Sequence, residues 1–340
     1  MGETEATPVA VEVCRGGRVE SRHRVAVVVA DSMCAIKLAM GDPAARVFPR
    51  SAVKPIQAIP LIESGAADAL HLDATELALA CASHGGEPGH SETVTAWLGR
   101  LGLGPDHLAC GPQLPSHRPT SALMQRRGDT PTRVHNNCSG KHSGMLSTAV
   151  HLGEPVAGYE LPEHPVQMRI RDVLEAMAGE TMPEPPGTDG CGIPAWTVSL
   201  TGLALMAARF ADPSDQEPAR RAAIHRLGAA MRAEPWYVAG TGRLCTALMQ
   251  AAPSVLAKTG AEGVFWAALP EHGLGIGLKA EDGSARAAEP ALIATLVALD
   301  ALDDAALAAL ADFARPTLRN RAGDVVGEIR PAAGWPAGGS

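Results

Sequence analysis

Ser51 and Lys54 stand three residues apart, directly before the apolar run 55–62. On a helix, side chains at this spacing lie on one face and reach each other. A lysine amine so placed can take the proton of a serine hydroxyl and make the serine a nucleophile. Serine and lysine also occur three apart by chance, so this pair alone is weak evidence of a catalytic site.

Two later stretches strengthen the case. Ser83 opens the sequence Ser-His-Gly-Gly, and Lys258 opens Lys-Thr-Gly. A Ser-x-x-Lys, a second serine and a Lys-Thr-Gly in this order are the signature of serine β-lactamases and penicillin-binding proteins. A lysine acts as a base only when its amine is neutral, and burial beside a second ammonium favours that form. Taken singly, Ser83 fits a helix-end hydroxyl and Lys258 a surface cation. As an ordered set with Ser51 and Lys54, we interpret them as catalytic residues.

The segment 135–144 is the densest group of polar and reactive side chains in the chain. It carries the thiol of Cys138, and a second thiol, Cys191, lies on a later glycine-rich loop. Two thiols with imidazoles beside them fit a zinc site. Spacing alone favours Cys138 and Cys191 with one or two of His135 and His142 as ligands. The alternative is a pair of buried free cysteines.

Composition limits the possible functions. The net charge of −8 argues against nucleic acid and anionic membranes as partners. No run reaches the ~18 apolar residues of a membrane span, and the acidic N-terminus lacks an apolar signal region. We therefore expect a cytoplasmic protein whose 7 cysteines are reduced thiols or metal ligands. Lysine is rare beside arginine, yet Lys54, Lys141 and Lys258 all fall in motif-like stretches, which indicates that an amine able to lose its proton is needed there.

The elements that must position these residues follow from the hydrophobic pattern. Strands rich in β-branched and apolar residues are predicted at 9–13, 25–29, 263–269, 273–279 and 325–329, and helices occupy most of the chain between them. Strands at both ends with helices between them predict an α/β (α+β) fold, with one sheet formed from N- and C-terminal strands, covered by helices, and a helical middle part. We predict a single domain over 1–330 and a disordered tail of Pro, Ala and Gly over 331–340.

Five stretches of the chain resemble the thermolabile, rhizobial-type L-asparaginases, also called class 3 or the asparaginase II family. These stretches are 48–57, 82–86, 135–142, 189–192 and 258–263. They are distributed over nearly the whole chain, and no motif position departs from the pattern. The resemblance implies a serine β-lactamase-like fold, a homodimer, and hydrolysis of the small molecule L-asparagine to L-aspartate and ammonia.

The resemblance also implies roles for single residues. It implies two Ser-Lys pairs, Ser51 with Lys54 and Ser83 with Lys258. It implies one zinc ion held by Cys138, Lys141 and Cys191 with water in the fourth position. The third protein ligand would then be a lysine, whereas spacing alone favours a histidine. Arg50, His142 and Asp189 would then lie near the substrate or the metal. Asp189 would hold the substrate ammonium, unless it is only a turn residue, and Arg50 could hold the carboxylate through a bidentate contact.

Two other functions fit part of these observations. A β-lactamase-like serine esterase or amidase would use the same nucleophile and would cleave nitrocefin. A non-catalytic zinc-thiol sensor would bind metal without turnover. Ammonia release from asparagine, compared with glutamine, separates these alternatives from an asparaginase.

Overall fold

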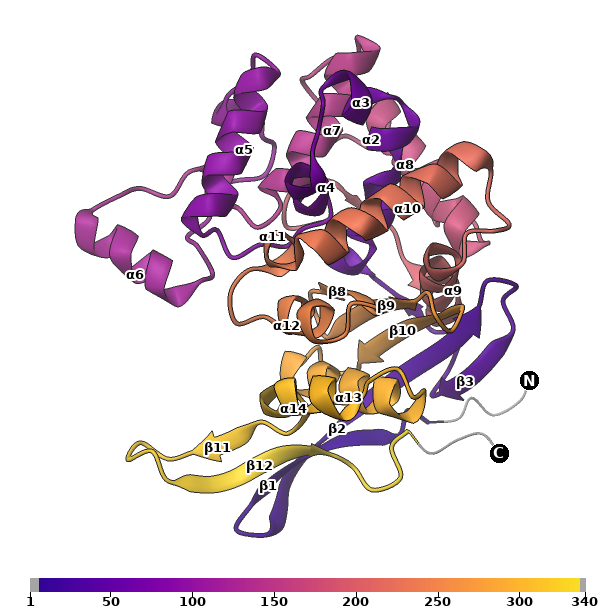
Figure 1. Cartoon of the computed structure of the whole chain (residues 1–340), viewed down its shortest axis with the longest axis vertical. Coiled ribbons are helices and arrows are strands. Elements are labelled where there is room, and N and C mark those ends of the chain that lie inside the picture. Colours follow the sequence, from indigo (N-terminus) through magenta and orange to yellow (C-terminus); the bar gives the residue numbers. More distant parts are fainter. Residues whose placement is uncertain (1–5, 337–340) are drawn as a thin grey trace. The chain divides into compact units, whose positions relative to one another are not determined.

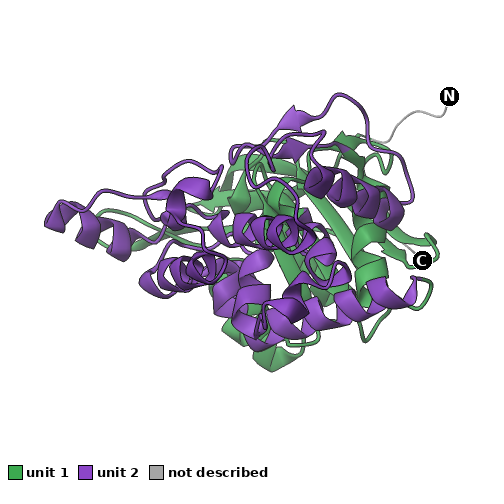
Figure 2. Cartoon of the chain, turned by 90° about the horizontal axis from the view of Figure 1, so that it is seen from above, with its two compact units in different colours: residues 1–52, 198–215, 247–340 green, residues 53–197, 216–246 purple. Residues whose placement is uncertain are grey.

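The computed structural model describes residues 6–336 and divides them into two compact units. Unit 1 comprises 6–52, Val198–Asp215 and 247–336, and unit 2 comprises Val53–Thr197 and Gln216–Thr246 (Figure 2). Each unit is described by itself below. The single domain expected over 1–330 stays a prediction.

Unit 1 is built on an eight-stranded antiparallel sheet to which both ends of the chain contribute (Figure 1). The strand order is β11-β12-β1-β2-β10-β9-β8, and β3 also pairs with β2. The strands are β1 (Val9–Arg15), β2 (Arg18–Asp31), β3 (Ile36–Met40), β8 (Leu256–Gly260), β9 (Val264–Leu269), β10 (Leu274–Ala280), β11 (Thr317–Arg319) and β12 (Val325–Pro331). A short pair, β4 (Arg46–Val47) with β7 (Val198–Ser199), lies outside this sheet. The predicted architecture, a sheet formed from N- and C-terminal strands, is confirmed.

Helices cover the sheet of unit 1. Helix α9 (Leu200–Ala211) packs so closely on β10 that a Cβ added to Gly275 would lie 2.0 Å from the backbone nitrogen of Ala208. Ile276, the next residue, is fully buried and points to the opposite face because side chains alternate along a strand. Helix α13 (Ala285–Ala298) contacts β10, β9, β2, β1 and β12. The shorter α14 (Asp304–Ala309) and α15 (Ala311–Ala314) follow it.

Unit 2 is mainly helical. Its helices are α1 (Lys54–Gln57), α2 (Ile59–Glu63), α3 (Ala66–Ala69), α4 (Ala74–Ala80), α5 (Pro88–Arg100), α6 (Arg118–Arg127), α7 (Ser139–Leu152), α8 (Pro165–Ala178), α10 (Pro218–Ala233) and α11 (Pro235–Ala239), with short 3₁₀ turns η2 (Pro105–His107) and η3 (Arg133–His135) and a two-stranded pair, β5 (Gly187–Thr188) and β6 (Pro194–Ala195). Helix α12 (Leu244–Ala251) contains the boundary at which the chain returns to unit 1. The predicted helical middle part is therefore present.

The helix that follows Ser51 is broken into pieces. A 3₁₀ turn, η1 (Arg50–Val53), precedes α1, and α2 begins one residue after α1 ends. Pro55 and Pro60 lack the backbone N–H that a continuous helix needs in its interior, and each stands at the start of its own piece instead. The motif therefore lies on short consecutive turns.

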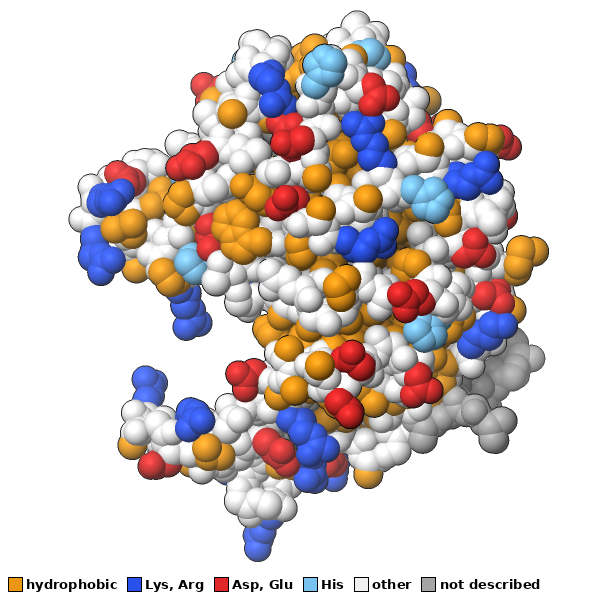
Figure 3. Space-filling model, viewed as in Figure 1, with side chains coloured by type: hydrophobic (Ala, Val, Ile, Leu, Met, Phe, Trp, Pro, Cys, Tyr) orange, Lys and Arg blue, Asp and Glu red, His pale blue; other side chains and the backbone are white. Residues whose placement is uncertain are grey.

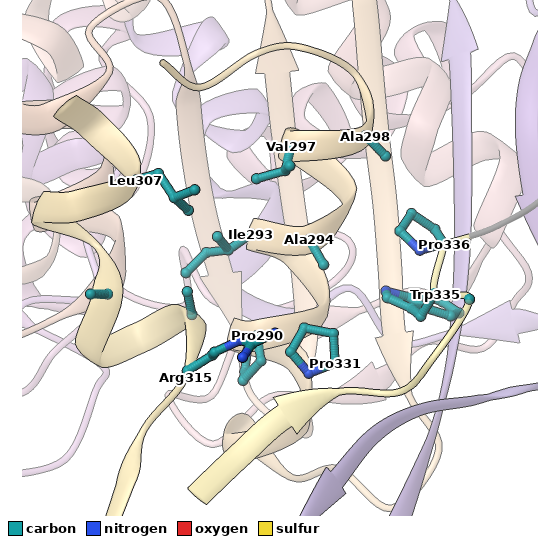
Figure 4. Close-up of a pocket in the computed structure, with 13 residues that line it drawn as sticks. Pro290, Ile293, Ala294, Val297, Ala298, Leu307, Arg315, Pro331, Trp335 and Pro336 are labelled. Atoms are coloured by element: carbon teal, nitrogen blue, oxygen red, sulfur yellow. The ribbon is translucent and has the colours of Figure 1, made fainter. Parts of the chain in front are cut away.

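The tail expected to be disordered from residue 331 onward is ordered over its first part. Pro331 is the last residue of β12, and the indole Nε1 of Trp335 donates to the carbonyl of Ala291 on α13 at 3.4 Å. Residues 337–340 lie outside the described part of the chain. Trp335 also lines an apolar pocket of about 560 Å³, together with side chains of α13 and α15 (Figure 4). The apolar contacts of the Trp335 indole explain why this segment is ordered although its composition predicts disorder.

On the face shown in Figure 3, acidic and basic side chains are interspersed. Among the described residues, no helix has the length and apolar character needed to cross a membrane.

Candidate functional site

The predicted site residues are divided between the units. Unit 1 carries Arg50, Ser51 and Lys258, and unit 2 carries Lys54, Ser83, Cys138, Lys141, His142, Asp189 and Cys191. The geometry of each set is given within its own unit.

Lys54 is the centre of the polar cluster in unit 2. Its side chain is fully buried, and its Nζ donates to the Ala82 carbonyl at 2.5 Å and to Ser83 Oγ at 3.0 Å. The same amine lies 3.2 Å from the Sγ of Cys138. One buried amine therefore contacts both the second predicted serine and the first predicted zinc thiol.

The loop that carries Ser83 is held by backbone hydrogen bonds to other segments of unit 2. The Ser83 N–H donates to the Val238 carbonyl at 2.9 Å, and the His84 N–H donates to the Asn137 carbonyl at 3.3 Å. Gly86 has a φ of +71°, and a Cβ there would lie 2.8 Å from the His135 carbonyl oxygen. Only glycine meets both conditions, which explains the second glycine of the Ser-His-Gly-Gly sequence.

The thiols form a second buried group beside Lys54. Cys138 begins α7 as its N-cap residue, and Lys141 on the first turn of that helix places Nζ 2.9 Å from the Sγ of Cys191. The two thiols hydrogen-bond to each other. The three predicted zinc-binding residues, Cys138, Lys141 and Cys191, therefore lie together in unit 2.

The charges in this group influence one another. The hydrogen bond with Cys191, aided by the nearby amines of Lys54 and Lys141, holds the pKa of Cys138 well below its ordinary value despite burial. The bond with Cys138 and then burial raise the pKa of Cys191. Burial favours the neutral amine of Lys141, but Cys191 and Cys138 outweigh it and raise the pKa of that lysine. The pKa values of the two thiols are thus shifted in opposite directions, that of Cys138 downward and that of Cys191 upward.

The donor set fits a zinc ion in its chemistry. Zinc prefers thiolate sulfur and nitrogen ligands, and the pKa of the Cys138 thiol is held below its ordinary value. The lysine would have to release its proton on binding. Spacing had favoured histidine ligands, but within residues 6–336 no three of His, Cys, Asp and Glu come together as a metal group. His135 instead accepts a hydrogen bond at Nδ1 from the Thr132 N–H at 3.1 Å.

His142 lies on α7 directly after Lys141 and is fully buried. Its Nδ1 lies 2.6 Å from the Tyr159 hydroxyl, which also accepts the Ala109 N–H at 2.8 Å. Its Nε2 has no hydrogen-bond partner among the described residues. Burial, reinforced by the charges of Lys141 and Lys54, holds the pKa of His142 well below its usual value. Burial raises the pKa of Tyr159.

Asp189 forms the turn that presents Cys191. Its N–H donates to the Ile193 carbonyl at 2.8 Å, and its own carbonyl accepts from Gly192, whose φ is +94°. Its carboxylate oxygen Oδ1 accepts the Gly190 N–H at 2.7 Å. The turn role is therefore shown, while a substrate role stays a prediction.

In unit 1, the Lys-Thr-Gly strand packs against the turn that carries Ser51. A Cβ added to Gly260 would lie 2.5 Å from the Pro49 carbonyl oxygen and 3.2 Å from the Ala52 backbone nitrogen. Lys258, two residues earlier on β8, is 1% exposed, and its Nζ donates to the Thr259 carbonyl at 2.9 Å. The structure therefore brings this strand and the Ser51 turn together.

Arg50 opens that turn in a strained conformation. Its φ of +50° lies in the left-handed region, which non-glycine residues rarely adopt. Such strain persists where the surrounding structure imposes it, and it is concentrated at functional sites. The conformation of Arg50 supports a role for this residue beyond chain connection.

Sequence reasoning missed two residues of unit 2. Tyr159 binds His142, and only its rarity could have drawn attention to it, since the chain has 2 tyrosines. Glu87 is buried at the end of the Ser83 loop and accepts from both the N–H and the hydroxyl of Thr241, at 2.8 and 2.7 Å. Its partner Thr241 is distant in sequence, so no local pattern predicts this contact.

The buried serine–lysine contact of unit 2 is of the kind that serves nucleophilic hydrolysis, and the family match supports an amidohydrolase. The family model described as L-asparaginase II matches residues 11–331, so the chain belongs to the L-asparaginase II family. No match was found among curated proteins.

Solved structures resemble the chain only distantly. Mglu in its native form is 15% identical with a TM-score of 0.48, over 84% of this chain and 67% of that chain. Mglu in its glutamate form is 14% identical with a TM-score of 0.44, over 82% and 61%. The Bacillus subtilis glutaminase YbgJ, as its covalent complex with 5-oxo-L-norleucine, is 13% identical with a TM-score of 0.38, over 82% and 88%. The chain thus spans about two thirds of the Mglu structures. At these TM-scores the likeness carries no argument about the site.

Proposed function

We propose that the chain hydrolyses L-asparagine to L-aspartate and ammonia by serine–lysine nucleophilic catalysis. The observation that carries the proposal is the buried amine of Lys54, which contacts Ser83 Oγ at 3.0 Å and stands three residues after Ser51. Family membership supports the amide as the bond that is cleaved. The packing of the Lys258 strand against the Ser51 turn supports a shared role for these two segments.

In the proposed reaction, Ser51 Oγ attacks the side-chain amide carbonyl and its proton passes to the neutral amine of Lys54. The C–N bond of the tetrahedral intermediate then breaks. The nitrogen leaves as ammonia, because the lysine amine returns the proton to it through the Ser83 hydroxyl. Water attacks the resulting ester, which releases aspartate and returns the proton to Ser51. General-base assistance of this kind contributes typically ~10²–10⁴-fold to the rate.

The remaining residues would position the substrate. Asp189 would pair with the substrate ammonium, and Arg50 would pair with its carboxylate through parallel N–H bonds. His142 would contact the substrate from α7. Cys138, Lys141 and Cys191 would hold zinc, which when bound would supply a fixed positive charge that orients the substrate or the protein around it.

Replacement of Ser51 tests the proposal. Ser51→Ala deletes one hydroxyl, so it should lower ammonia release from L-asparagine by about 10³-fold or more while the thermal midpoint stays unchanged. Exposed Ser116→Ala makes the same chemical change and should leave the rate intact. A Ser51→Ala enzyme that keeps more than about a few per cent of the rate would exclude this nucleophile.

A zinc-thiol sensor is the second candidate, and the buried group of Cys138, Cys191 and Lys141 favours it. Zinc binding without ammonia release from asparagine or glutamine would establish it. Cleavage of nitrocefin would instead indicate a β-lactamase-like esterase or amidase. The homodimer and the cytoplasmic location stay predictions.

A further inference from the structure

Three groups of unit 2 form a buried hydrogen-bonded chain beside the thiol group. The Ala109 N–H donates to the Tyr159 hydroxyl at 2.8 Å, and that hydroxyl lies 2.6 Å from Nδ1 of His142. Tyr159 is 1% exposed and His142 is fully buried. Among the described residues the far nitrogen of the imidazole, Nε2, has no partner.

The numbers of hydrogen-bond donors and acceptors in this chain of three groups determine where the protons lie. A tyrosine hydroxyl has a single hydrogen, and the Ala109 N–H already uses one of its lone pairs. If Tyr159 donates to Nδ1 of a neutral His142, only Nε2–H is left without a partner. If Nδ1–H donates to Tyr159 instead, both the tyrosine hydrogen and Nε2 are left unpaired. A charged imidazolium would leave two donors unpaired and bury a charge as well, so the first arrangement costs least.

We propose that Tyr159 is a positioning residue that fixes His142 in the tautomer with the proton on Nε2, so that His142 presents an N–H donor to an oxygen of the substrate. In this tautomer neither nitrogen has a free lone pair, since Nδ1 accepts from Tyr159 and Nε2 carries hydrogen. The substrate role rests on the proposed function, whereas the tautomer rests on the hydrogen bonds alone.

The amide side chains of Gln and Asn imitate the two imidazole nitrogens. The amide nitrogen of His142→Gln falls near the position of Nε2, and that of His142→Asn falls near Nδ1. We expect His142→Gln to keep kcat/KM for L-asparagine within about tenfold of the wild type, and His142→Asn to lose about 100-fold, mainly through a higher KM. Equal losses in the two variants would overturn the donor role.

The tautomer itself is read from the ¹⁵N spectrum of the full-length protein labelled at histidine, with His142→Gln to assign the signal. Wild-type His142 should carry its proton on Nε2, and a proton on Nδ1 would overturn the inference. Tyr159→Phe should shift His142 away from the pure Nε2–H form and raise KM. Tyr237→Phe makes the same change at the other tyrosine and should do neither. An unchanged tautomer in Tyr159→Phe would overturn the positioning role.

Should Tyr159→Phe fail to fold, the wild-type spectrum and the Gln and Asn pair still test the proposal. Failure of the proposed function has a separate signature. In that case the wild type would release no ammonia from asparagine, while the Nε2–H signal would remain and uphold the tautomer.

Discussion

Gly260 offers a direct test of whether the Lys-Thr-Gly strand sets the position of Ser51. A Cβ added there would lie 2.5 Å from the Pro49 carbonyl oxygen, whereas unstrained heavy-atom contacts are about 3.5 Å apart. Strand and turn must therefore separate by about 1 Å in Gly260→Ala. Overpacking of this kind costs about 1–3 kcal/mol of stability. A misplacement of about 1 Å at a reacting group can cost about 10²-fold in rate.

The assay compares ammonia release from L-asparagine with the free energy of unfolding in urea. We expect Gly260→Ala to remain folded, to lose about 1–3 kcal/mol, and to lose about 10²-fold in kcat/KM. Gly99→Ala on α5 is the control, because a Cβ there meets no atom within 4 Å. It should keep full activity and gain a little stability through helix propensity. A Gly260→Ala enzyme with wild-type kcat/KM would refute the idea that this strand positions Ser51.

Three further predictions follow from the buried groups. Cys138→Ser and Cys191→Ser should each lower bound zinc far below one per chain, as measured by metal analysis, and undiminished zinc in both would remove the site. Lys54→Arg keeps the charge but cannot act as a base, so it should lose several orders of magnitude in rate and should no longer become faster as pH rises. Lys258→Arg should retain more activity. A near-normal rate with an unchanged pH profile in Lys54→Arg would exclude Lys54 as the base. Burial lowers the pKa of His90, so the unfolded state takes up its proton near its ordinary pKa of ~6.5 while the folded state does not. Stability should therefore fall as pH drops below ~6.5, and His90→Gln should lose less stability than wild type in urea unfolding of metal-free protein at pH 5 against pH 8; an identical loss would refute it.

Local patterns were enough to predict β1, β2, β9, β10 and β12, whereas β3, β8 and β11 were not among the predicted strands. The β-branched runs around residues 9–13 and 25–29 became the β1–β2 hairpin, and the run after Lys258 became β9. These predictions hold because a run of β-branched residues is a pattern that can be seen in the local sequence. The family resemblance implied a set of Cys138, Lys141 and Cys191; these side chains lie together in unit 2, and their zinc role stays a prediction.

What failed depended on contacts between distant residues. His135 is well spaced for a zinc ligand, but within residues 6–336 it joins no metal-binding group with Cys138 and Cys191. The tail from residue 331 has the composition of a disordered segment, yet Trp335 finds a buried place against α13. Tyr159 is separated from Ala109 by 50 residues, and nothing in the local sequence reveals that the two share a hydrogen bond.

The strand order of unit 1 has a consequence for synthesis on the ribosome. Val25 to Asp31 of β2 pair with Leu274 to Ala280 of β10, and β1 pairs with β12 at the far end of the chain. The hairpin that emerges first gains β3 soon afterwards, but it must wait for most of the chain before β10 and β12 exist, and such non-local pairing slows folding. Until then, the apolar edge of β2 is open to pairing with other chains. Shortened chains that end before β10 should consequently aggregate during expression, even though the residues of unit 2 have all been made.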